Sequence, residues 1–272
     1  MDLEQKSDYL KSLIAGLESA AVAFSAGVDS SFLLKTAHGV LGDRCAAFTV
    51  SSCLTPEREI REASEFCRGY GIRHFIIESD PLKICGFAEN PPDRCYICKS
   101  ALFRLIISEA EKEDFRFVLE GSNADDSADY RPGFRAVREL GVKSPLIDAG
   151  FSKIEIRMLS QIAGLDSGRK PSMACLASRI PYGEMITLKK LSMASEAEDF
   201  LAECGFAGCR VRVHGGHLAR IELLEENIAM LADSGLRKRI SDEFKKMGFL
   251  YVSLDIDGYR TGSLNEALFL KK

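Results

Sequence analysis

Residues 20–42 have the sequence AAVAFSAGVDSSFLLKTAHGVLG, in which a small apolar run is followed by a glycine-containing turn and a helical pattern. The run AAVAFS, residues 20–25, carries no charge, which is typical of a strand buried on both faces of a sheet. The run SFLLKTAHGVLG has helical periodicity and ends at glycine. This segment therefore predicts a strand, a tight turn and a helix.

The same alternation continues along the chain. Further strands are expected at residues 45–52, 74–79 and 115–122, and helices at 5–17, 56–71, 100–114 and 152–165. Strands that alternate with helices at this spacing predict βαβ units, so we expect an α/β fold with a Rossmann-like parallel sheet. Residues 89–99, ENPPDRCYICK, are rich in Pro and Cys and predict a loop.

The pattern changes after an irregular segment at residues 166–184, which is dense in Pro, Gly, Ser and Arg and predicts a boundary or an active-site loop. Beyond it we expect a helix at 187–203, the strands RVRVHG and LARIELL, a long helix at 225–246 and the strand LYVSLDID. These elements predict a smaller α+β domain. The expected domains are therefore residues 1–185 and 186–272.

Composition excludes several classes of protein. The chain has 272 residues, of which 46% are hydrophobic and 28% charged, so it can bury enough apolar surface to fold. No run of about 18 uncharged apolar residues suggests a membrane span, and the first residues, MDLEQKSDYLKSLIAG, lack the apolar core of a signal peptide. We expect a cytoplasmic protein.

Charge argues against a nucleic-acid partner. The net charge is −4, and residues 186–272 carry 13 Lys and Arg against 13 Asp and Glu, so neither half of the chain is basic.

Residues 25–31, SAGVDSS, join the first predicted strand to its helix and suggest a phosphate site. Backbone N–H groups at a helix N-terminus attract anions, Gly27 allows close approach, and Ser25, Ser30 and Ser31 add hydroxyl donors. Asp29 would repel phosphate unless a divalent cation or a helical N–H group neutralises it. The alternative is an ordinary helix cap made by Ser or Asp.

Cysteine is unusual in this chain, which contains nine of them. In a reducing cytosol, cysteines are thiols, metal ligands or catalysts rather than disulfides. Cys95 and Cys98 have the spacing of a redox pair, of half a zinc knuckle, or of two ligands of an iron–sulfur cluster, and two unconnected thiols remain an alternative. No second Cys-x-x-Cys completes a zinc site, and the context does not resemble a thioredoxin.

Cys175 is the candidate for a third functional cysteine. Arg169, Lys170 and Arg179 are its neighbours in sequence, and positive charges make a thiolate available at neutral pH. The alternative is a buried structural cysteine. The remaining cysteines lie in apolar or amphipathic settings and are expected to serve packing or to be incidental: Cys45, Cys53, Cys67, Cys85, Cys204 and Cys209.

The motif SAGVDSS resembles the SGGxDS pyrophosphate loop of the PP-loop ATPases (adenine nucleotide alpha hydrolase-like), which cleave ATP to AMP and pyrophosphate. Ala26 stands where this family usually has glycine. A second stretch, residues 120–126, EGSNADD, is similar to the family's G-x-N-x-x-D motif facing the nucleotide phosphates, which implies roles for Asn123 and Asp126. Alone, that stretch is equally typical of an Asx-rich turn.

Residues 123–133, residues 174–183 and the motifs of the second predicted domain resemble the LarE family of sulfur transferases over nearly the whole chain. The resemblance implies a Mg²⁺- and ATP-dependent enzyme. Such an enzyme adenylates the carboxylate of a pyridinium dicarboxylate mononucleotide and converts it to a thiocarboxylate for the nickel-pincer nucleotide cofactor. The family has two sulfur sources: one cysteine, matching Cys175, that gives up its own sulfur, or a 4Fe-4S cluster held by three cysteines. Cys95, Cys98 and Cys175 match the second kind, which uses a sulfide donor.

The second predicted domain offers two arginines and several polar residues. Arg210 and Arg212 alternate on a strand and share a face, for which spacing alone favours a solvated surface. The resemblance instead implies that they bind a phosphate of substrate or nucleotide, and that Glu222 contacts metal or substrate. His214 and His217 flank two glycines and predict a turn with exposed histidines.

Other functions remain in competition. A tRNA thiolase of the same superfamily shares the loop and the cysteines, but it predicts a basic RNA-binding module. An amidotransferase-linked synthetase gives no role to Cys95 and Cys98, and a nucleotide sensor would bind ATP without turnover. The resemblance also implies a homo-oligomer, in this family a hexamer.

Overall fold

The computed structural model describes residues 1–128, 132–169, 175–260 and 262–269. Its central sheet contains four parallel strands in the order β3-β2-β1-β4. Their bounds are Ala20–Ala23 for β1, Cys45–Ser51 for β2, Arg73–Glu78 for β3 and Phe117–Leu119 for β4. The strand order reverses between β1 and β4. In an open parallel sheet, ligands bind in the crevice at the carboxyl ends of the strands at such a point.

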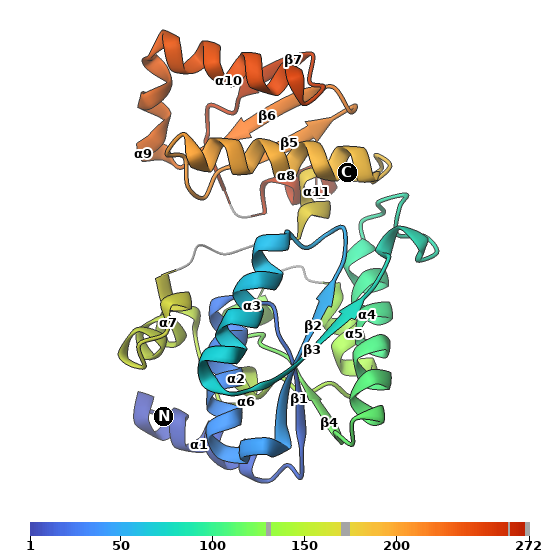
Figure 1. The fold of residues 1–272 in the computed structure, drawn as a ribbon, viewed down its shortest axis with the longest axis vertical. Coiled ribbons are helices and arrows are strands. Elements are labelled where there is room, and N and C mark those ends of the chain that lie inside the picture. Colours follow the sequence, from blue (N-terminus) through green and yellow to red (C-terminus); the bar gives the residue numbers. More distant parts are fainter. Residues whose placement is uncertain (129–131, 170–174, 261, 270–272) are drawn as a thin grey trace. The chain divides into compact units, whose positions relative to one another are not determined.

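Helices cover both faces of this sheet, as the uncharged strand sequences predict (Figure 1). Ala20 and Val22 point into a core shared with α1, α2, α3 and α7, whereas Ala21 points into a second core with α4 and α5. The bounds are Leu3–Ala15 for α1, Val28–Leu41 for α2, Glu57–Tyr70 for α3, Arg94–Lys112 for α4, Gly133–Glu139 for α5, Pro145–Asp148 for α6 and Lys153–Ile162 for α7. The predicted Rossmann-like α/β fold is confirmed, in an arrangement consistent with a PP-loop fold.

Helix α4 begins earlier than the sequence predicted. Residues 89–99 were expected to form a loop, but the helix starts at Arg94, where the amides of Tyr96 and Ile97 donate to the Asp93 carbonyl at 2.8 and 3.2 Å. Pro91 and Pro92 lie before this start and do not interrupt it. The predicted loop is therefore wrong from Arg94 onward, and Cys95 and Cys98 are helical.

A second compact unit contains a three-stranded mixed sheet in the order β5-β6-β7. Helices α8 and α10 contribute to its apolar core with alternate residues of β5 and β6, among them Val211 and Ile221. The bounds are Leu188–Glu203 for α8, Arg210–His214 for β5, Leu218–Glu222 for β6, Glu225–Ile228 for α9, Ser234–Lys246 for α10, Tyr251–Leu254 for β7 and Glu266–Phe269 for α11. The predicted smaller α+β unit is confirmed.

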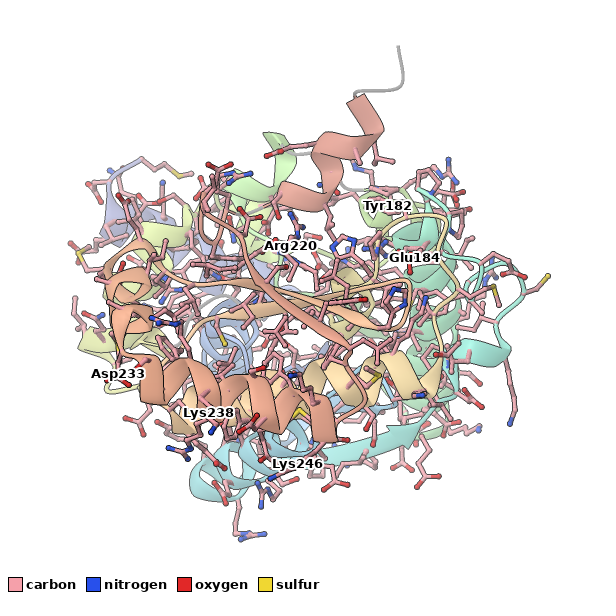
Figure 2. The ribbon with its side chains drawn as sticks, turned by 90° about the horizontal axis from the view of Figure 1, so that it is seen from above. Tyr182, Glu184, Arg220, Asp233, Lys238 and Lys246 are labelled. Atoms are coloured by element: carbon pink, nitrogen blue, oxygen red, sulfur yellow. The ribbon has the colours of Figure 1, made fainter. Side chains whose placement is uncertain are left out.

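The long helix predicted at residues 225–246 is wrong. It is divided into α9, a 3-10 turn at Ala229–Ala232 and α10. The break lies at Asp233, which has an extended backbone and whose carboxylate accepts a hydrogen bond from the amide of Leu236. An Asp at this position starts a new helix rather than continuing the old one. Lys238 and Lys246 then lie along α10 (Figure 2).

The two compact units divide the chain differently from the predicted boundary at residues 185 and 186. The first unit contains residues 1–84 and 93–173, and the second contains 85–92 and 174–272. The fully buried amide of Asn90 explains this division, because it donates to the carbonyls of Ile180 and Pro181 at 3.1 and 2.7 Å. The amide of Ile186 also donates to the carbonyl of Ala88 at 2.8 Å. Residues 85–92 are thereby attached to the irregular segment that precedes α8.

No helix within the described ranges is long and apolar enough to span a membrane.

Candidate functional site

The turn between β1 and α2 is strained at Ala26, whose φ is 55°. A residue with a Cβ atom seldom adopts this left-handed conformation, which favours glycine. The methyl group of Ala26 is nevertheless buried and fits its surroundings. The departure from the glycine expected at this position therefore leaves the turn intact.

Gly27 occupies the N-cap of α2, and within the described part of the chain no side chain caps the helix. The alternative of an ordinary cap made by Ser or Asp is therefore not what the structure contains. The hydroxyl of Ser30 instead accepts from the amide of Ser25 at 3.3 Å and donates to the carbonyl of Gly27 at 3.2 Å. The Ser25 and Ser30 hydroxyls lie 3.2 Å apart. Ser30 thus braces a turn that leaves the helix N-terminus without a side-chain cap, as an anion site requires.

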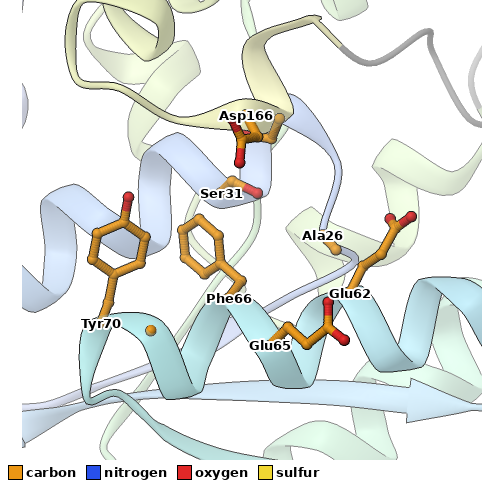
Figure 3. A pocket seen from close by; sticks show the side chains of 9 residues that line it. Ala26, Ser31, Glu62, Glu65, Phe66, Tyr70 and Asp166 are labelled. Atoms are coloured by element: carbon orange, nitrogen blue, oxygen red, sulfur yellow. The ribbon is translucent and has the colours of Figure 1, made fainter.

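Ser31, in the first turn of α2, is buried beside the phosphate loop. Its side chain lines a groove of about 540 Å³, together with Glu62, Glu65, Phe66 and Asp166 (Figure 3). Its hydroxyl is buried and has no hydrogen-bond partner among the described residues. The carboxylates along this groove disfavour phosphate. Ser31 nevertheless stays a predicted phosphate ligand together with Ser25 and Ser30, because Ala26 of the phosphate loop lines the same groove.

The second predicted motif lies against the first one. A Cβ atom added to Gly121 would lie 2.9 Å from the nitrogen of Ser30 and 3.1 Å from its Cα atom. Only glycine allows this approach, because real Cβ atoms essentially never come so close. Glu120, just before it, is buried and accepts from the hydroxyls of Ser122 and Ser144 at 2.6 and 2.5 Å. The end of β4 is therefore fixed against the N-terminus of α2.

Asn123 and Asp126 follow this glycine. Asn123 is buried, and its side-chain oxygen accepts from the amide of Asp125 at 3.0 Å, so the Asx turn weighed as an alternative is present. One carboxylate oxygen of Asp126 accepts from the amide of Asn123 at 3.0 Å. The structure thus brings both residues to the carboxyl edge of the sheet, beside Gly121.

Asp29 forms an ion pair with Lys153, the first residue of α7. Burial raises the pKa of the Asp29 carboxyl above its ordinary value, and the charge of Asp126 adds to this, while Lys153 and Arg157 oppose it. Lys153 belongs to none of the motifs from which the site was predicted. A cation in the first turn of a helix opposes the helix dipole. The position of Lys153 at the start of a predicted helix was therefore the one indication that it has a specific anionic partner.

A divalent cation fits this carboxylate pair. One oxygen of Asp29 is buried and has no hydrogen-bond partner among the described residues, and Asp126 is close enough to raise the pKa of Asp29. Carboxylate oxygens are the ligands that Mg²⁺ prefers. Asp29 and Asp126 are therefore the residues of this unit that would hold Mg²⁺ beside a phosphate.

Cys95 and Cys98 lie one turn apart on α4, in the first unit. Cys95 is exposed and Cys98 is half-buried. The intervening Tyr96 donates to a carboxylate oxygen of Glu139 at 2.7 Å, and Arg135 lies 3.6 Å from the centre of its ring. Residues three apart on a helix share a face, so the two thiols can reach one metal ion or cluster.

The other cysteines divide by exposure. Burial raises the pKa of Cys45, Cys67 and Cys209 to about 12, which confirms the prediction that these are packing residues. Cys53 and Cys204 are half-buried, whereas Cys85 is exposed. No three His, Cys, Asp or Glu side chains gather into a metal site within the described ranges.

Cys175 belongs to the second unit and is exposed, so the alternative of a buried structural cysteine is wrong. Its carbonyl accepts from Arg179 at 3.3 Å, and the Cys175 thiol acts electrostatically on the same guanidinium. Arg179 is buried and forms two hydrogen bonds with Glu198, at 2.7 and 2.8 Å. Lys170 and the side chain of Arg169 lie outside the described residues.

Arg210 and Arg212 are buried, so the solvated strand face that spacing favoured is wrong. Arg210 donates to the Cys209 carbonyl at 2.7 Å, and its guanidinium lies 5.1 Å from the centre of the Tyr259 ring. Arg212 donates to the carbonyl of Ser178 at 2.9 Å. These contacts cover the polar face of β5 with residues from the segments on either side of it in sequence.

Glu222 is fully buried and accepts from Arg212 at 2.6 Å, with Arg220 at 3.2 Å. The Nε atoms of Arg212 and Arg220 are buried and have no hydrogen-bond partner among the described residues. Donors left open in this way fit an anion. Glu222 thus holds two arginines, and the arginines retain capacity for a phosphate.

The two histidines behave differently. His217 is exposed, as predicted, and its ring lies 2.9 Å from the carbonyl oxygen of Gly215. His214 is half-buried, which corrects the prediction, and burial lowers its pKa below the ordinary value.

Comparison with known proteins identifies relatives along almost the whole chain. No protein-family model matches it. An uncharacterised protein of Synechocystis is 40% identical over 267 residues, covering 98% of this chain and 99% of the relative. An uncharacterised protein of Methanocaldococcus jannaschii is 28% identical over 240 residues, covering 88% of this chain and 90% of the relative.

A third relative has a named activity. It is the pyridinium-3,5-bisthiocarboxylic acid mononucleotide synthase of Lactiplantibacillus plantarum, 33% identical over 267 residues, which are 98% of this chain and 96% of the relative. Identity at this level over the full length shows common family membership. The chain belongs to the pyridinium-3,5-bisthiocarboxylic acid mononucleotide synthase family, the LarE family that its motifs resemble.

Proposed function

We propose that the protein is an ATP-dependent sulfurtransferase that adenylates a carboxylate of a pyridinium dicarboxylate mononucleotide and converts it to a thiocarboxylate. The product would serve nickel-pincer nucleotide cofactor biosynthesis. The Lactiplantibacillus relative is named as a synthase of the bisthiocarboxylic acid mononucleotide, which supports a product of this class. The observation that carries the proposal is the approach of Gly121 to Ser30, which joins two phosphate-type motifs at the point where the strand order reverses.

In this proposal ATP binds with its phosphates against residues 25–31. The N–H groups of Val28, Asp29 and Ser30 lie at the N-terminus of α2, where the helix dipole favours an anion. Asn123 and Asp126 lie on the other side of this site, and Asp29 and Asp126 would hold Mg²⁺. Lys153 would then exchange its contact with Asp29 for the phosphates, which supplies a positive charge to the departing pyrophosphate.

Adenylation is a displacement at the α-phosphorus. A carboxylate oxygen of the substrate attacks this phosphorus, the bond to the bridging oxygen breaks, and pyrophosphate leaves with its electron pair. The resulting acyl-adenylate has AMP as a good leaving group. A free carboxylate is a poor acyl donor, so this activation is what makes sulfur transfer possible.

Sulfur then attacks the acyl carbon and AMP departs. If Cys175 supplies the sulfur, its thiolate forms a thioester. Loss of the Cys175 Cα proton to a base then breaks the Cβ–S bond, releasing the thiocarboxylate and leaving dehydroalanine. The exposure of Cys175 and the adjacent charge of Arg179 support a role as thiolate.

The alternative sulfur source is a 4Fe-4S cluster ligated by Cys95, Cys98 and Cys175. The one-turn spacing of Cys95 and Cys98 on α4 fits two of these ligand positions. Such a cluster, when bound through three thiolates, supplies a site for sulfide from an external donor, so that the chain is not consumed. The contacts of Tyr96 with Glu139 and Arg135 would fix the first turn of α4, and with it the positions of the two cysteine ligands.

Arg210 and Arg212 would bind the phosphate of the mononucleotide. The unpartnered Nε of Arg212 and the neighbouring Nε of Arg220 support an anion at this face. We further propose that the protein acts as a homo-oligomer, a hexamer as the family resemblance implies.

The proposal is tested by incubating the purified protein with ATP, Mg²⁺ and the pyridinium dicarboxylate mononucleotide under anaerobic conditions. Mass spectrometry of the small molecules should detect the thiocarboxylate, and Cys175→Ser should abolish it. Cys85→Ser is the matched control, because Cys85 is also exposed and lies in the same compact unit. Salt-sensitive tRNA binding without thiocarboxylate formation would favour the tRNA thiolase instead.

The sulfur source is tested separately. After anaerobic reconstitution with iron and sulfide, wild type and Cys85→Ala should show the absorption of an iron–sulfur cluster, and Cys98→Ala should lose it. If wild type takes up no cluster while Cys175 is converted to dehydroalanine during turnover, sulfur comes from Cys175 itself.

A further inference from the structure

Thr49 and His74 form a hydrogen-bonded chain behind the phosphate loop. The hydroxyl of Thr49, on β2, donates to the carbonyl of Phe24 at 2.8 Å. The Nε2 atom of His74, on β3, lies 2.8 Å from the same hydroxyl oxygen. Thr49 and Phe24 are both buried. These contacts connect the neighbouring strands to the residue that precedes Ser25.

The chain leaves the sheet at this residue. The amide of Phe24 still donates to the carbonyl of Phe48 at 2.8 Å, in continuation of the β1–β2 ladder. Two residues later, Ala26 has a φ of 55°, so the backbone has turned away from β2. The Phe24 carbonyl lies where the ladder ends, and its partner is the hydroxyl of Thr49.

The donor and acceptor roles in this chain follow from its geometry. Thr49 has a single hydroxyl proton, and the carbonyl of Phe24 can only accept it. The Thr49 oxygen is then the acceptor for His74, which must carry a proton on Nε2. Burial lowers the pKa of His74, which favours the neutral ring. The aromatic ring of Phe24 packs near that of His74, with 6.4 Å between ring centres.

The carbonyl of Phe24 and the amide of Ser25 belong to one rigid peptide plane. Thr49 binds the carbonyl end of this plane, and the amide end donates to the Ser30 hydroxyl at 3.3 Å. Rotation of the plane would break both bonds. The orientation of the first peptide of the loop is thus determined from two sides, by the sheet and by α2.

We propose that Thr49 and His74 are positioning residues that set the entry geometry of the phosphate loop and thereby its affinity for Mg-ATP. This inference rests on the proposed function in so far as ATP is the ligand. Neither residue belongs to the SAGVDSS or EGSNADD motif. Their role is to orient the Phe24–Ser25 peptide, which in turn places Ser25 and Ser30.

The test is the dissociation constant of Mg-ATP for the full chain, measured by calorimetry together with the melting temperature. Thr49→Val keeps the shape of the side chain and removes the hydroxyl. It should raise the dissociation constant about tenfold, because a tenfold change corresponds roughly to the loss of one hydrogen bond. Thr49→Ser keeps the hydroxyl and should restore affinity to within about twofold of wild type. His74→Phe should raise the dissociation constant less than Thr49→Val does. His74→Gln keeps an N–H donor and should therefore bind Mg-ATP with nearly the wild-type dissociation constant.

Thr36→Val, farther along α2, is the control for the chemical change alone. A purely structural role for Thr49 would lower the melting temperature and leave the affinity of the folded protein unchanged, and that result would overturn the inference. A wild-type affinity for Mg-ATP in His74→Phe would show that His74 does not position the phosphate loop.

Failure of the proposed function has a different outcome. If wild type binds no Mg-ATP, that proposal fails, and the positioning role is decided by the amide resonance of Ser25. This resonance should shift in Thr49→Val and not in Thr49→Ser. An unchanged resonance in Thr49→Val would contradict the positioning role.

Discussion

Gly121, after β4, lies so close to Ser30, in the first turn of α2, that a Cβ atom at position 121 would be 2.9 Å from the Ser30 nitrogen. The two residues are far apart in sequence, and each belongs to a separate short motif. Their contact makes the motifs one site, because the end of β4 and the N-terminus of α2 can meet only if one of them lacks a side chain.

Gly121→Ala should displace the N-terminus of α2. Relief of the overlap requires backbone movement, because the atoms that a Cβ would meet are main-chain atoms of Ser30 and Asp29. We expect a loss of about 1–3 kcal/mol in the free energy of unfolding, and weaker Mg-ATP binding, measured by denaturant unfolding and calorimetry. Gly39→Ala is the matched control, because Gly39 lies in α2 and has open space around it. This substitution should raise the free energy of unfolding by up to about 1 kcal/mol. Equal behaviour of the two variants would contradict the steric argument.

Lys153→Met should raise the pKa of Asp29 further. Burial already holds this pKa above its ordinary value of 3.8, and Lys153 is the leading influence that lowers it. A raised pKa means that the folded protein binds this proton more tightly than the unfolded chain. The contribution of Asp29 to the unfolding free energy therefore falls as pH rises from 3.8 through the folded-state pKa. The titration is followed by carboxyl carbon NMR, with Lys153→Arg as the charge-conserving control, and an unchanged Asp29 titration in Lys153→Met would show that the ion pair is not maintained.

Glu198→Ala should destabilise the second unit strongly. Glu198 pairs with buried Arg179 and also accepts from the amide of Val211 at 2.9 Å. Its removal leaves a buried guanidinium without its counter-charge, which costs about 3–5 kcal/mol. Thermal unfolding measures the effect. Glu109→Ala, which removes the partner of exposed Lys112, should change the melting temperature little. A similarly small effect of Glu198→Ala would show that Arg179 is hydrated in solution.

Alkylation should separate the cysteines by exposure. In the native protein near pH 8, iodoacetamide should modify Cys85, Cys95 and Cys175 first, because these are exposed. Cys45, Cys67 and Cys209 should react only after unfolding, since burial raises the pKa of each to about 12 and blocks access. Peptide mass spectrometry measures the rates. Rapid native labelling of Cys45 or Cys67 would mean that the core around β2 and α3 opens readily.

The sequence predicted what local patterns encode. The uncharged run at residues 20–25 identified a buried strand, and SAGVDSS identified the turn that follows, because both depend on neighbouring residues. The sequence did not reveal side-chain pairs between separate elements: nothing near Asp29 points to Lys153, and the strand pattern did not pair Arg212 with Glu222. The burial of Arg210 and Arg212 on β5 was missed for the same reason. Alternation predicts which residues share a face of a strand, but not which other segments cover that face. Cys95 and Cys98 were assigned to a loop because two prolines precede them, although prolines before a helix do not prevent its start.

Carboxylate adenylation is the central claim, and the fate of the carboxylate oxygen tests it most directly. The pyridinium dicarboxylate mononucleotide is prepared with heavy oxygen in its carboxylates and incubated with the protein, Mg-ATP and a sulfide source. Attack of the carboxylate on the α-phosphorus, followed by departure of AMP, transfers one heavy oxygen atom to AMP. Mass spectrometry should therefore detect AMP carrying one heavy oxygen in the same amount as thiocarboxylate. AMP without the label, or thiocarboxylate formed without AMP, would contradict the account.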